Sequence, residues 1–316
     1  MSTSAKQRFL YFCCLVAVNL LWAAQYPAYK IASDHMGVAT LNFWALLLSS
    51  ILLAPFVIRQ RSPVPRGARL WFQFVILALL GIVPPSVLLA WGVAHSTGAN
   101  AAILSMTIPV LMSVMGVFLL RERLTTIRIV SLLLALGGTV LISHSDFQGS
   151  SFRRDLLIGN AVIFLAGAGS AFYNAYSKKL LETFSEIEVL LYGYLISVAA
   201  CAVIALLTGE RAFYNVRAFP ISAWIAVACL GGMSWGLAMV LWMWVLKRIE
   251  VSQASVSIYM LSIFGVLLSA IMLHERLGLM QIIGGIIVVV ATVLATEFDH
   301  RISQRRKALL PDEAVH

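Results

Sequence analysis

The sequence predicts an all-α membrane protein whose ten transmembrane helices form two inverted five-helix repeats. Three observations favour this fold class: an apolar composition, ten apolar segments of membrane-spanning length and an internal repeat. Of the 316 residues, 60% are hydrophobic and 12% are charged, whereas charged residues make up about 25% of a soluble domain. A soluble protein of this length could not bury so many apolar side chains, so we expect a lipid bilayer to surround the chain.

Ten segments meet the requirement of roughly 20 mostly apolar residues for a helix that crosses a bilayer. The connections between them are short and leave no room for a soluble domain. In order along the chain, the segments are Phe9–Tyr29, Thr40–Ile58, Leu70–Ala94, Gly98–Leu120, Thr125–Ser143, Asp155–Ser177, Ile187–Thr208, Pro220–Leu246, Val251–Leu273 and Gly278–Thr296.

The first segment has features of a cleaved signal peptide, because Lys6 and Arg8 precede an apolar stretch. The internal repeat favours a retained helix instead. The residues Tyr-Pro-Ala-Tyr at 26–29 are echoed by Tyr-Asn-Ala-Tyr at 173–176, so the first segment has a partner in the sixth. Removal of the first segment would leave the second half with an unmatched helix.

The internal repeat is clearest where an apolar run ends in Glu-Arg-Leu. One copy covers residues 99–124, and the other covers residues 252–277. We therefore divide the chain into two homologous halves, residues 1–148 and residues 149–316, the second of which ends in a charged tail. Five helices per half is an odd number, so the second half inserts upside down relative to the first. Inverted repeats are typical of transporters, which bind their substrates near mid-membrane where the halves meet.

Adjacent glycines stand in the fifth and tenth segments, at Gly137-Gly138 and Gly284-Gly285. Small residues of this kind permit close approach between membrane helices. The contact lies either within one chain or between two chains, which leaves a homodimer open.

Prolines interrupt three of the predicted segments, at Pro27, at Pro84-Pro85 and at Pro109. A proline lacks the backbone donor and bends a helix. Broken helices are expected near the binding sites of transporters, although proline kinks are also ordinary packing devices in membranes.

Basic residues set the expected orientation, because the cytoplasmic loops of membrane proteins are enriched in Lys and Arg. With the N-terminus inside, most of the 23 lysines and arginines fall on the inner side and both termini lie in the cytoplasm. The net charge of +9 then reflects loops that face an anionic leaflet rather than nucleic-acid binding. The basic residues expected on the outer side are Lys30, Arg153, Arg154, Arg211, Arg217 and Arg276.

These features resemble the EamA family within the drug/metabolite transporter superfamily. The resemblance covers nearly the whole chain, and it rests on the ten segments, the two similar halves and the Glu-Arg-Leu ends at 122–124 and 275–277. It implies a ten-helix carrier of the inner membrane, of a family that often exports amino acids or other small metabolites. Membership of such a family does not fix the substrate.

Aromatic and amide side chains in related segments are candidates for the wall of a substrate cavity. Trp22, Tyr26 and Tyr29 are spaced i, i+4 and i+7 and so share one helical face, and Tyr173 and Tyr176 repeat part of this pattern. Amides interleaved with the rings favour a cavity, and the alternative is an aromatic belt at the lipid interface. The candidate substrate-binding residues are Trp22, Gln25, Tyr26, Tyr29, Trp91, Asn100, Tyr173, Asn174, Tyr176, Trp235, Gln253 and Tyr259.

Polar residues also occupy matching helix ends in the two halves. Asn100 and Gln253 correspond at the starts of the fourth and ninth segments, where an amide can bind substrate and where Asn100 can equally cap the helix. A carboxylate beside an arginine ends both segments, and the inverted topology puts the two pairs on opposite sides of the bilayer. They act either as gate ion pairs or only as helix-end markers. These candidate residues are Glu122, Arg123, Glu275 and Arg276.

We predict a transporter of the inner membrane that exports a small amphipathic solute, such as an amino acid, by alternating access without a cofactor, a metal or covalent chemistry. No segment carries Asp or Glu near its middle, which favours a neutral or zwitterionic solute over an organic cation. An uptake permease is the alternative within this class. The alternative from another class is a membrane-embedded enzyme, but the sequence contains no clustered catalytic set, phosphate loop or nucleophile elbow.

Overall fold

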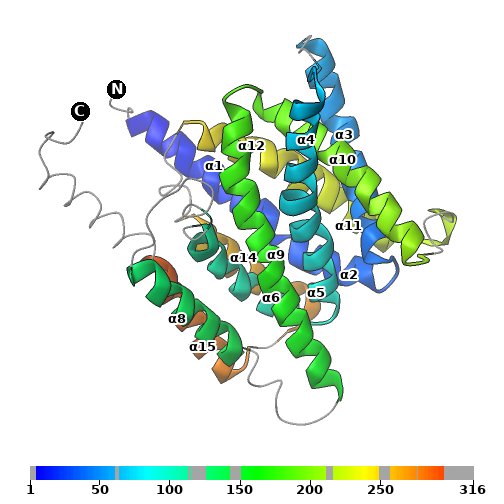
Figure 1. The fold of residues 1–316 in the computed structure, drawn as a ribbon. Coiled ribbons are helices and arrows are strands. Elements are labelled where there is room, and N and C mark those ends of the chain that lie inside the picture. The colour runs from blue at the N-terminus through cyan, green and yellow to red at the C-terminus, as the bar shows by residue number, and fades with distance from the viewer. Residues whose placement is uncertain are drawn as a thin grey trace, which may run out of the picture.

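A computed structural model describes residues 5–60, 64–112, 115, 126–142, 151–210, 216–248, 257–275 and 277–294 of the chain. Every regular element in these ranges is a helix, and none is a β-strand. The helices pack together into one bundle, as Figure 1 shows. The prediction of an all-helical fold is therefore confirmed.

The helices of the first half begin near the N-terminus and include two π-helical stretches (η1 and η2) and a short 3₁₀ turn (η3). In chain order they are α1 (Ala5–Ala23), α2 (Gln25–Ser33), α3 (Val38–Arg59), α4 (Ala68–Ile76), η1 (Leu77–Ile82), η2 (Pro84–Leu88), α5 (Leu89–Ala94), α6 (Gly98–Leu104), η3 (Ser105–Thr107) and α8 (Thr126–Ile142).

The helices of the second half follow the same general plan, with one π-helical stretch (η7) and one 3₁₀ turn (η6). In chain order they are α9 (Ser151–Leu181), α10 (Glu186–Leu207), η6 (Val216–Ala218), α11 (Ile221–Ala228), η7 (Cys229–Ala238), α12 (Met239–Leu246), α14 (Ile258–Leu273) and α15 (Leu279–Val293).

Six helical runs in the described residues are long and apolar enough to cross a membrane, and each matches one predicted segment. Four shorter apolar helices fall within the other four predicted segments, so the total of ten spans stays a prediction. The long runs are Phe9–Ser33, Val38–Arg59, Ala68–Ala94, Arg154–Leu181, Glu186–Leu207 and Ile221–Leu246, and the short ones are Gly98–Met112, Ile129–Gly138, Met260–Leu273 and Leu279–Ala291.

Helices that the sequence repeat pairs with one another also pack against one another. α3 packs against α10, and α6 packs against α14. Shortly after α10 ends, Glu210 accepts hydrogen bonds from the start of α3, and Glu275, just after α14, accepts hydrogen bonds from the start of α6. The end of each helix thus meets the start of its counterpart, so the two helices of each pair run antiparallel.

The contacts between the halves are also reciprocal. The first span, through α1, packs against η7, α12 and α14 of the second half. Its counterpart in the repeat, α9, packs against η1, η2, α5 and α6, which occupy the corresponding places in the first half. Each half therefore inserts its first span into the other half, and the core of the bundle is shared between them.

α8 and α15 form a closely packed pair at one edge of the bundle (Figure 1). A Cβ atom added at Gly138 would lie 2.9 Å from the carbonyl oxygen of Gly284 and 2.7 Å from the side chain of Val288. The neighbouring Gly137 faces open space. The close approach at Gly138 therefore lies within one chain, and a homodimer stays a prediction.

Departures from regular α-helix occur at the predicted proline positions. The first span divides into α1 and α2 at Ala24, just after Ala23, whose carbonyl the ring of Pro27 obstructs. Pro84 begins the π-helical stretch η2, and η3 directly precedes the Ile108-Pro109 dipeptide. The third and eighth spans, which correspond in the repeat, both contain π-helical turns, and such turns often mark functional sites.

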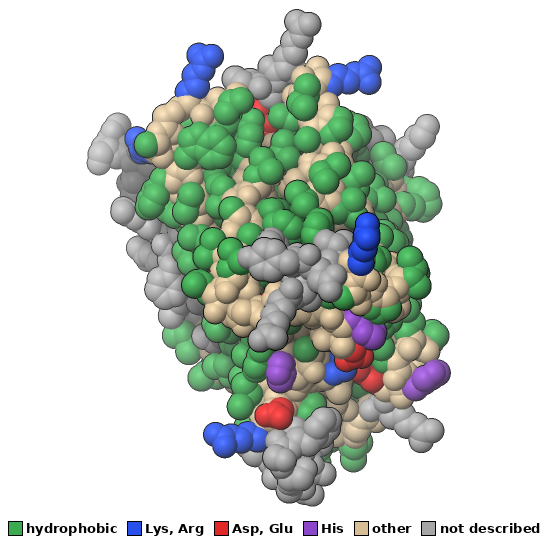
Figure 2. Space-filling model, turned by 90° about the vertical axis from the view of Figure 1, so that its right-hand side faces the viewer, with side chains coloured by type: hydrophobic (Ala, Val, Ile, Leu, Met, Phe, Trp, Pro, Cys, Tyr) green, Lys and Arg blue, Asp and Glu red, His purple; other side chains and the backbone are tan. Residues whose placement is uncertain are grey.

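The surface is apolar over most of its height. Large hydrophobic side chains such as Phe56, Leu207, Ile221, Ile271 and Leu279 are exposed. Figure 2 shows hydrophobic side chains across the middle of the face in view, with the charged ones gathered mostly toward its two ends. This distribution fits a protein whose middle lies in hydrocarbon and whose ends lie in water.

Candidate functional site

A cavity of about 100 Å³ lies in the shared core, where α1, α2, η1 and η2 face α9, η7, α12 and α14. A single water molecule needs about 10–15 Å³ on this measure, so the cavity has room for more than an isolated water. Its wall combines aromatic rings with hydroxyl and amide groups. The aromatic lining residues are Trp22, Tyr26, Tyr173, Trp235 and Trp242, and the polar ones are Gln25, Ser105, Ser170, Asn174 and Ser234.

The two halves contribute equivalent positions to this cavity. Several lining residues form pairs with the same separation along the chain as Glu122 and Glu275. Tyr26 and Tyr173, from the first and sixth spans, form a further matched pair. The cavity therefore lies where the inverted halves meet. The pairs at the common separation are Gly81 with Ser234, Leu89 with Trp242, Ser105 with Ile258 and Ile108 with Leu261.

Tyr26 is fixed from two sides. Its hydroxyl lies 2.6 Å from the Oγ of Ser105, and that Oγ donates to the carbonyl oxygen of Ala101, so the tyrosine is the donor in the first contact. On the other side, a Cβ added at Gly265 would lie 2.7 Å from the Tyr26 ring, so α14 approaches the ring closely. Tyr26 thereby joins the first, fourth and ninth spans at the cavity.

A buried hydrogen-bond network supports the wall behind Trp235. The indole Nε1 of Trp235 donates to the hydroxyl of Tyr29 at 3.3 Å, and that hydroxyl donates to Oδ1 of Asn42 at 3.2 Å. The carbonyl oxygen of Trp235 accepts from the hydroxyl of Tyr194 at 2.7 Å. Tyr29 and Tyr194 are fully buried, and together these bonds hold Trp235 in place from three other spans.

Trp242 forms another part of the aromatic wall. Its ring centroid lies 5.0 Å from that of Trp22, and its Nε1 donates to Oδ1 of Asn174 at 3.1 Å. The amide nitrogen of Asn174 donates to the carbonyl of Ser170 at 2.8 Å. The ring pair and the amide thus join the first, sixth and eighth spans.

Tyr173 differs from the other polar groups of the cavity. The side chain is 5% exposed, and its hydroxyl has no hydrogen-bond partner among the described residues. A Cβ added at Gly81 would lie 3.1 Å from the Cα and Cβ of Tyr173, so η1 and α9 approach each other closely at this point. The absence of a side chain at Gly81 lets Tyr173 sit against the cavity.

Six of the twelve candidate substrate-binding residues line the cavity, and four others lie elsewhere. Tyr29 lies behind Trp235, as described above. Trp91 stacks on His95 with ring centroids 3.9 Å apart, and Tyr176 stacks on Phe172 at 5.2 Å. The six that line it are Trp22, Gln25, Tyr26, Tyr173, Asn174 and Trp235.

Asn100 belongs to a separate cluster of amides. Its backbone N–H donates to Oγ1 of Thr97, which caps α6. Its side chain donates to Oδ1 of Asn160 at 3.2 Å and accepts from Nε2 of Gln281 at 2.7 Å. The cap of α6 is thus supplied by Thr97 rather than by Asn100, whose side chain joins the fourth, sixth and tenth spans.

The other candidates fall outside the described part of the chain. Gln253, Glu122, Arg123 and Arg276 lie in the ranges left undescribed, and only the backbone of Tyr259 is described, within α14. Their roles stay predictions.

Ser105, Ser170 and Ser234 line the cavity although the sequence did not single them out. Ser105 and Ser234 were detectable from the repeat, since each stands opposite another lining position at the common separation. Ser170 stands one helical turn before Tyr173 on the same face of α9. A serine alone carries no signal of this kind, because its hydroxyl commonly bonds to the backbone of its own helix.

Glu275 caps a helix of the other half. Its Oε1 and Oε2 accept hydrogen bonds from the backbone N–H groups of Gly98 at 3.0 Å and Ala99 at 2.8 Å. These N–H groups open α6 and have no partner within the helix, and the helix dipole favours a negative charge here. The residue before Glu275, His274, adopts a left-handed conformation with φ of 56° that turns the chain at the end of α14.

Two further charged groups act at the same end of the bundle. Glu210 accepts hydrogen bonds from the backbone N–H and hydroxyl of Thr40 at 2.8 and 2.6 Å, and a Cβ at Gly37 would lie only 2.1 Å from its carboxylate carbon. Lys30 donates to the carbonyl oxygens of Val93, Ala94 and Ser96 where α5 ends. Each charge therefore complements the helix end that it meets.

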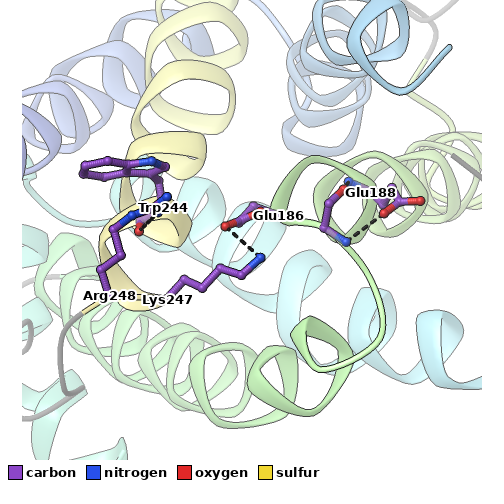
Figure 3. A network of polar contacts seen from close by, with 6 residues as sticks. Glu186, Glu188, Trp244, Lys247 and Arg248 are labelled. Atoms are coloured by element: carbon purple, nitrogen blue, oxygen red, sulfur yellow. Dashed lines mark hydrogen bonds and ion pairs between the residues drawn. The ribbon is translucent and has the colours of Figure 1, made fainter. Parts of the chain in front are cut away.

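A different network lies at the other end of α10 (Figure 3). Lys247, at the end of α12, forms an ion pair with Glu186 at 3.3 Å, and Ser185 and Glu188 cap α10 reciprocally. The guanidinium of Arg248 stacks 4.0 Å above the ring of Trp244. This end carries lysines and arginines that the sequence places on the inner side.

The lining residues indicate what kind of solute the cavity could hold. Among the described residues that line it, none is Asp, Glu, Lys, Arg or His. Among the described residues, no group of three or more His, Cys, Asp or Glu side chains could hold a metal ion. The lining suits a solute with an apolar body and a polar end, because it offers rings together with hydroxyl and amide groups.

Comparison with known proteins identifies similar chains. A model described as the EamA-like transporter family matches residues 9–144 and 157–296, once in each half. A "probable terminal-alkyne amino-acid exporter" of Streptantibioticus cattleyicolor is 24% identical over 305 residues, which cover 94% of this chain and 96% of that protein. An "uncharacterized transporter" of Archaeoglobus fulgidus is 24% identical over 287 residues, which cover 91% of this chain and 97% of the relative.

A solved structure, described as "Crystal structure of protein", also resembles this one. The two structures superpose with a TM-score of 0.63 at 18% sequence identity, and the match covers 93% of this chain and 99% of the other. At this identity the likeness concerns the fold alone.

Proposed function

The chain belongs to the EamA-like transporter family, and from this premise we propose that it exports a small amphipathic solute, such as a free amino acid, through the central cavity by alternating access. Membership makes the protein a multi-pass membrane transporter of small molecules. The more specific choice of an amino acid is supported by the relative named a probable amino-acid exporter. The chemistry of the cavity wall supports it as well.

The composition of the wall is the observation that carries the proposal. Rings from both halves, including Trp22 and Trp242, offer flat apolar surfaces to a side chain. Hydroxyl and amide groups such as those of Asn174 and Ser234 offer hydrogen bonds to a polar end. Because no charged side chain lines the cavity in the described part of the chain, a solute with a net charge would lack a counter-charge there. A zwitterion or a neutral solute fits best.

The same arrangement supports alternating access. We assign ten spans to two inverted halves, residues 1–148 and 149–316, with the substrate at their meeting point. Two similar halves in opposite orientations can exchange conformations at little net energy, which turns an outward-open cavity into an inward-open one. In this proposal Glu275 is part of the outer gate, because its hydrogen bonds to α6 join the halves at one end of the bundle.

The proposed location is the inner membrane with both termini in the cytoplasm. In that orientation Lys30, Glu210 and Glu275 lie on the outer side, and the network of Glu186 and Lys247 lies on the inner side. The basic residues of the inner side then face anionic lipid headgroups.

The direct test is transport by the purified protein in proteoliposomes, screened across free amino acids with and without a pH gradient. We expect saturable movement of at least one amphipathic amino acid. Tyr26→Ala and Tyr173→Ala, which remove a ring from each half of the wall, should each lower transport at least tenfold, while Tyr192→Ala, from an aromatic cluster with Trp71 and Phe74, should not lower it.

Two outcomes would contradict the proposal. Normal transport by both cavity variants, with normal membrane insertion, would show that the solute does not pass between these rings. A wild-type protein that transports another solute but no amino acid would show that amino acids are not the substrate class. Vesicles of defined orientation distinguish export from uptake, because an uptake permease would accumulate the solute in the opposite direction.

A further inference from the structure

Tyr26 and Tyr173 occupy matching positions in the two halves but differ in their hydrogen bonds. The hydroxyl of Tyr26 donates to Ser105, as its 2.6 Å distance and the bond from Ser105 to Ala101 require. The hydroxyl of Tyr173 has no partner among the described residues, although the side chain is 5% exposed. Of the buried polar atoms that lack a partner in the described part of the chain, this one alone belongs to a residue that lines the cavity.

The sequence explains why the second half lacks the bond. Ser105 has its repeat counterpart at Ile258, and both residues line the cavity. An isoleucine side chain neither accepts nor donates a hydrogen bond. The partner that the first half provides for Tyr26 is therefore missing for Tyr173, and an exchange of conformation between the halves would not supply it.

A buried hydroxyl without a partner destabilises a protein, and in native structures such a group usually has a reason. Two other donors of the wall are already occupied: Trp242 donates to Asn174, and Trp235 donates to Tyr29. The Tyr173 hydroxyl thus keeps a proton for which the described residues offer no acceptor. A solute that brings an acceptor atom into the cavity could accept a hydrogen bond from this hydroxyl.

We propose that Tyr173 is the specificity-determining residue of the cavity and that its hydroxyl donates a hydrogen bond to the carboxylate of the transported solute. This inference rests on the proposed function and adds to it the end of the solute that is recognised and the group that recognises it. A small movement of the ring as the solute binds brings the hydroxyl, now shielded from solvent, against the carboxylate. Tyr26, whose proton is already committed to Ser105, holds the spans together.

The first test compares two probes that share an amino group and an isobutyl side chain. L-leucine carries a carboxylate, and 3-methylbutylamine is leucine without it. In proteoliposomes containing the wild-type protein, unlabelled L-leucine should compete with labelled L-leucine far better than the amine does. In Tyr173→Phe, which keeps the ring, we expect L-leucine affinity to fall about tenfold or more, as for the loss of a hydrogen bond to a charged group. The affinity for the amine should stay the same.

The second test needs no solute. Because the Tyr173 hydroxyl has no bond to lose among the described residues, Tyr173→Phe should unfold at the same temperature as the wild type or slightly higher, whereas Tyr26→Phe should unfold several degrees lower. Ile258→Ser removes a buried apolar side chain, and this loss is the same whether or not residue 173 carries a hydroxyl. With Tyr173 present, the new serine should supply the missing partner, so Ile258→Ser should unfold at a higher temperature than the double variant Tyr173→Phe/Ile258→Ser, and it should weaken L-leucine transport by occupying the hydroxyl.

The outcomes separate this inference from the proposed function. Wild-type transport of L-leucine that Tyr173→Phe leaves unchanged, or equal loss of unfolding temperature in Tyr173→Phe and Tyr26→Phe, would overturn the role of Tyr173 while the transporter assignment stands. A wild-type protein that transports 3-methylbutylamine at the same rate as L-leucine would also overturn the role of Tyr173. If the wild type moves neither L-leucine nor any other amino acid, the proposed function is wrong. The proposal that Tyr173 binds the carboxylate of the solute is then wrong as well.

Discussion

Tyr29 illustrates how a single hydroxyl can hold the wall of the cavity. It accepts from Nε1 of Trp235 and donates to Oδ1 of Asn42, and its side chain is fully buried. Tyr29→Phe leaves a buried donor and a buried acceptor without partners. We expect the free energy of unfolding to fall by about 1–3 kcal/mol, measured as a lower unfolding temperature in detergent.

The matched control for this prediction is Tyr192→Phe. Tyr192 packs edge-on against the rings of Trp71 and Phe74, and these contacts survive loss of the hydroxyl. Its unfolding temperature should stay near that of the wild type. An equal loss in both variants would mean that the hydroxyl of Tyr29 has no special role.

For single residues, the sequence predicted which types of side chain line the cavity better than it predicted their hydrogen-bond partners. Helical spacing placed Trp22 and Tyr26 on one face, and both line the cavity. The same spacing included Tyr29, which lies behind the wall, where its hydroxyl is bonded to Trp235 and Asn42. The bond from Tyr26 to Ser105 joins residues far apart in the chain, and no local pattern contains that information.

Two adjacent glycines provide a test at the level of helix packing. On α8, a Cβ at Gly138 would lie 2.9 Å from the carbonyl oxygen of Gly284, while a Cβ at Gly137 meets nothing within 4 Å. Alanine is favoured over glycine within a helix by about 0.5–1 kcal/mol. Gly137→Ala should therefore raise the unfolding temperature, and Gly138→Ala should lower it by forcing α8 and α15 apart.

The two substitutions are chemically identical and one residue apart, so each serves as the control for the other. The measurement is thermal unfolding of both variants beside the wild type. Equal shifts of the same sign would contradict the packing of α8 on α15 described here.

Glu275 tests how helix ends close one side of the bundle. Glu275→Gln removes the charge that complements the start of α6 and places an amide NH2 against one of the two N–H groups of Gly98 and Ala99. We expect faster hydrogen–deuterium exchange at the start of α6 and an altered transport rate. Glu186→Gln, at the opposite end of the bundle, is the control and should leave exchange at α6 unchanged.

Unchanged exchange at α6 in Glu275→Gln would reject the cap. Faster exchange with an unaltered transport rate would leave Glu275 as a helix-end marker and reject its role as a gate.

The elements themselves were largely predictable, because hydropathy over about 20 residues depends on composition alone. Six predicted segments correspond to helices of spanning length. The division of the first span falls at Ala24, close to where Pro27 requires it. The π-helical turns of η1 and η7 were not predictable, because neither stretch contains a proline to signal a departure from α-helix.

For the whole molecule, the repeat predicted two halves and an inverted relation but not how they interlock. The antiparallel contacts of α3 with α10 and of α6 with α14 agree with the inverted relation. The insertion of the first span of each half into the other half emerges only in three dimensions. That exchange puts equivalent positions such as Ser105 and Ile258 around one cavity, and the account of transport depends on it.

The central claim is that this cavity is the pathway of the solute and opens to each side in turn. The most direct measurement is labelling of a single cysteine, Ser234→Cys, with a membrane-impermeant thiol reagent added to one side at a time, in a protein whose native cysteines are replaced. We expect labelling from both sides of the membrane and protection from labelling by a transported amino acid. Labelling from one side alone, or labelling that the solute does not slow, would contradict it.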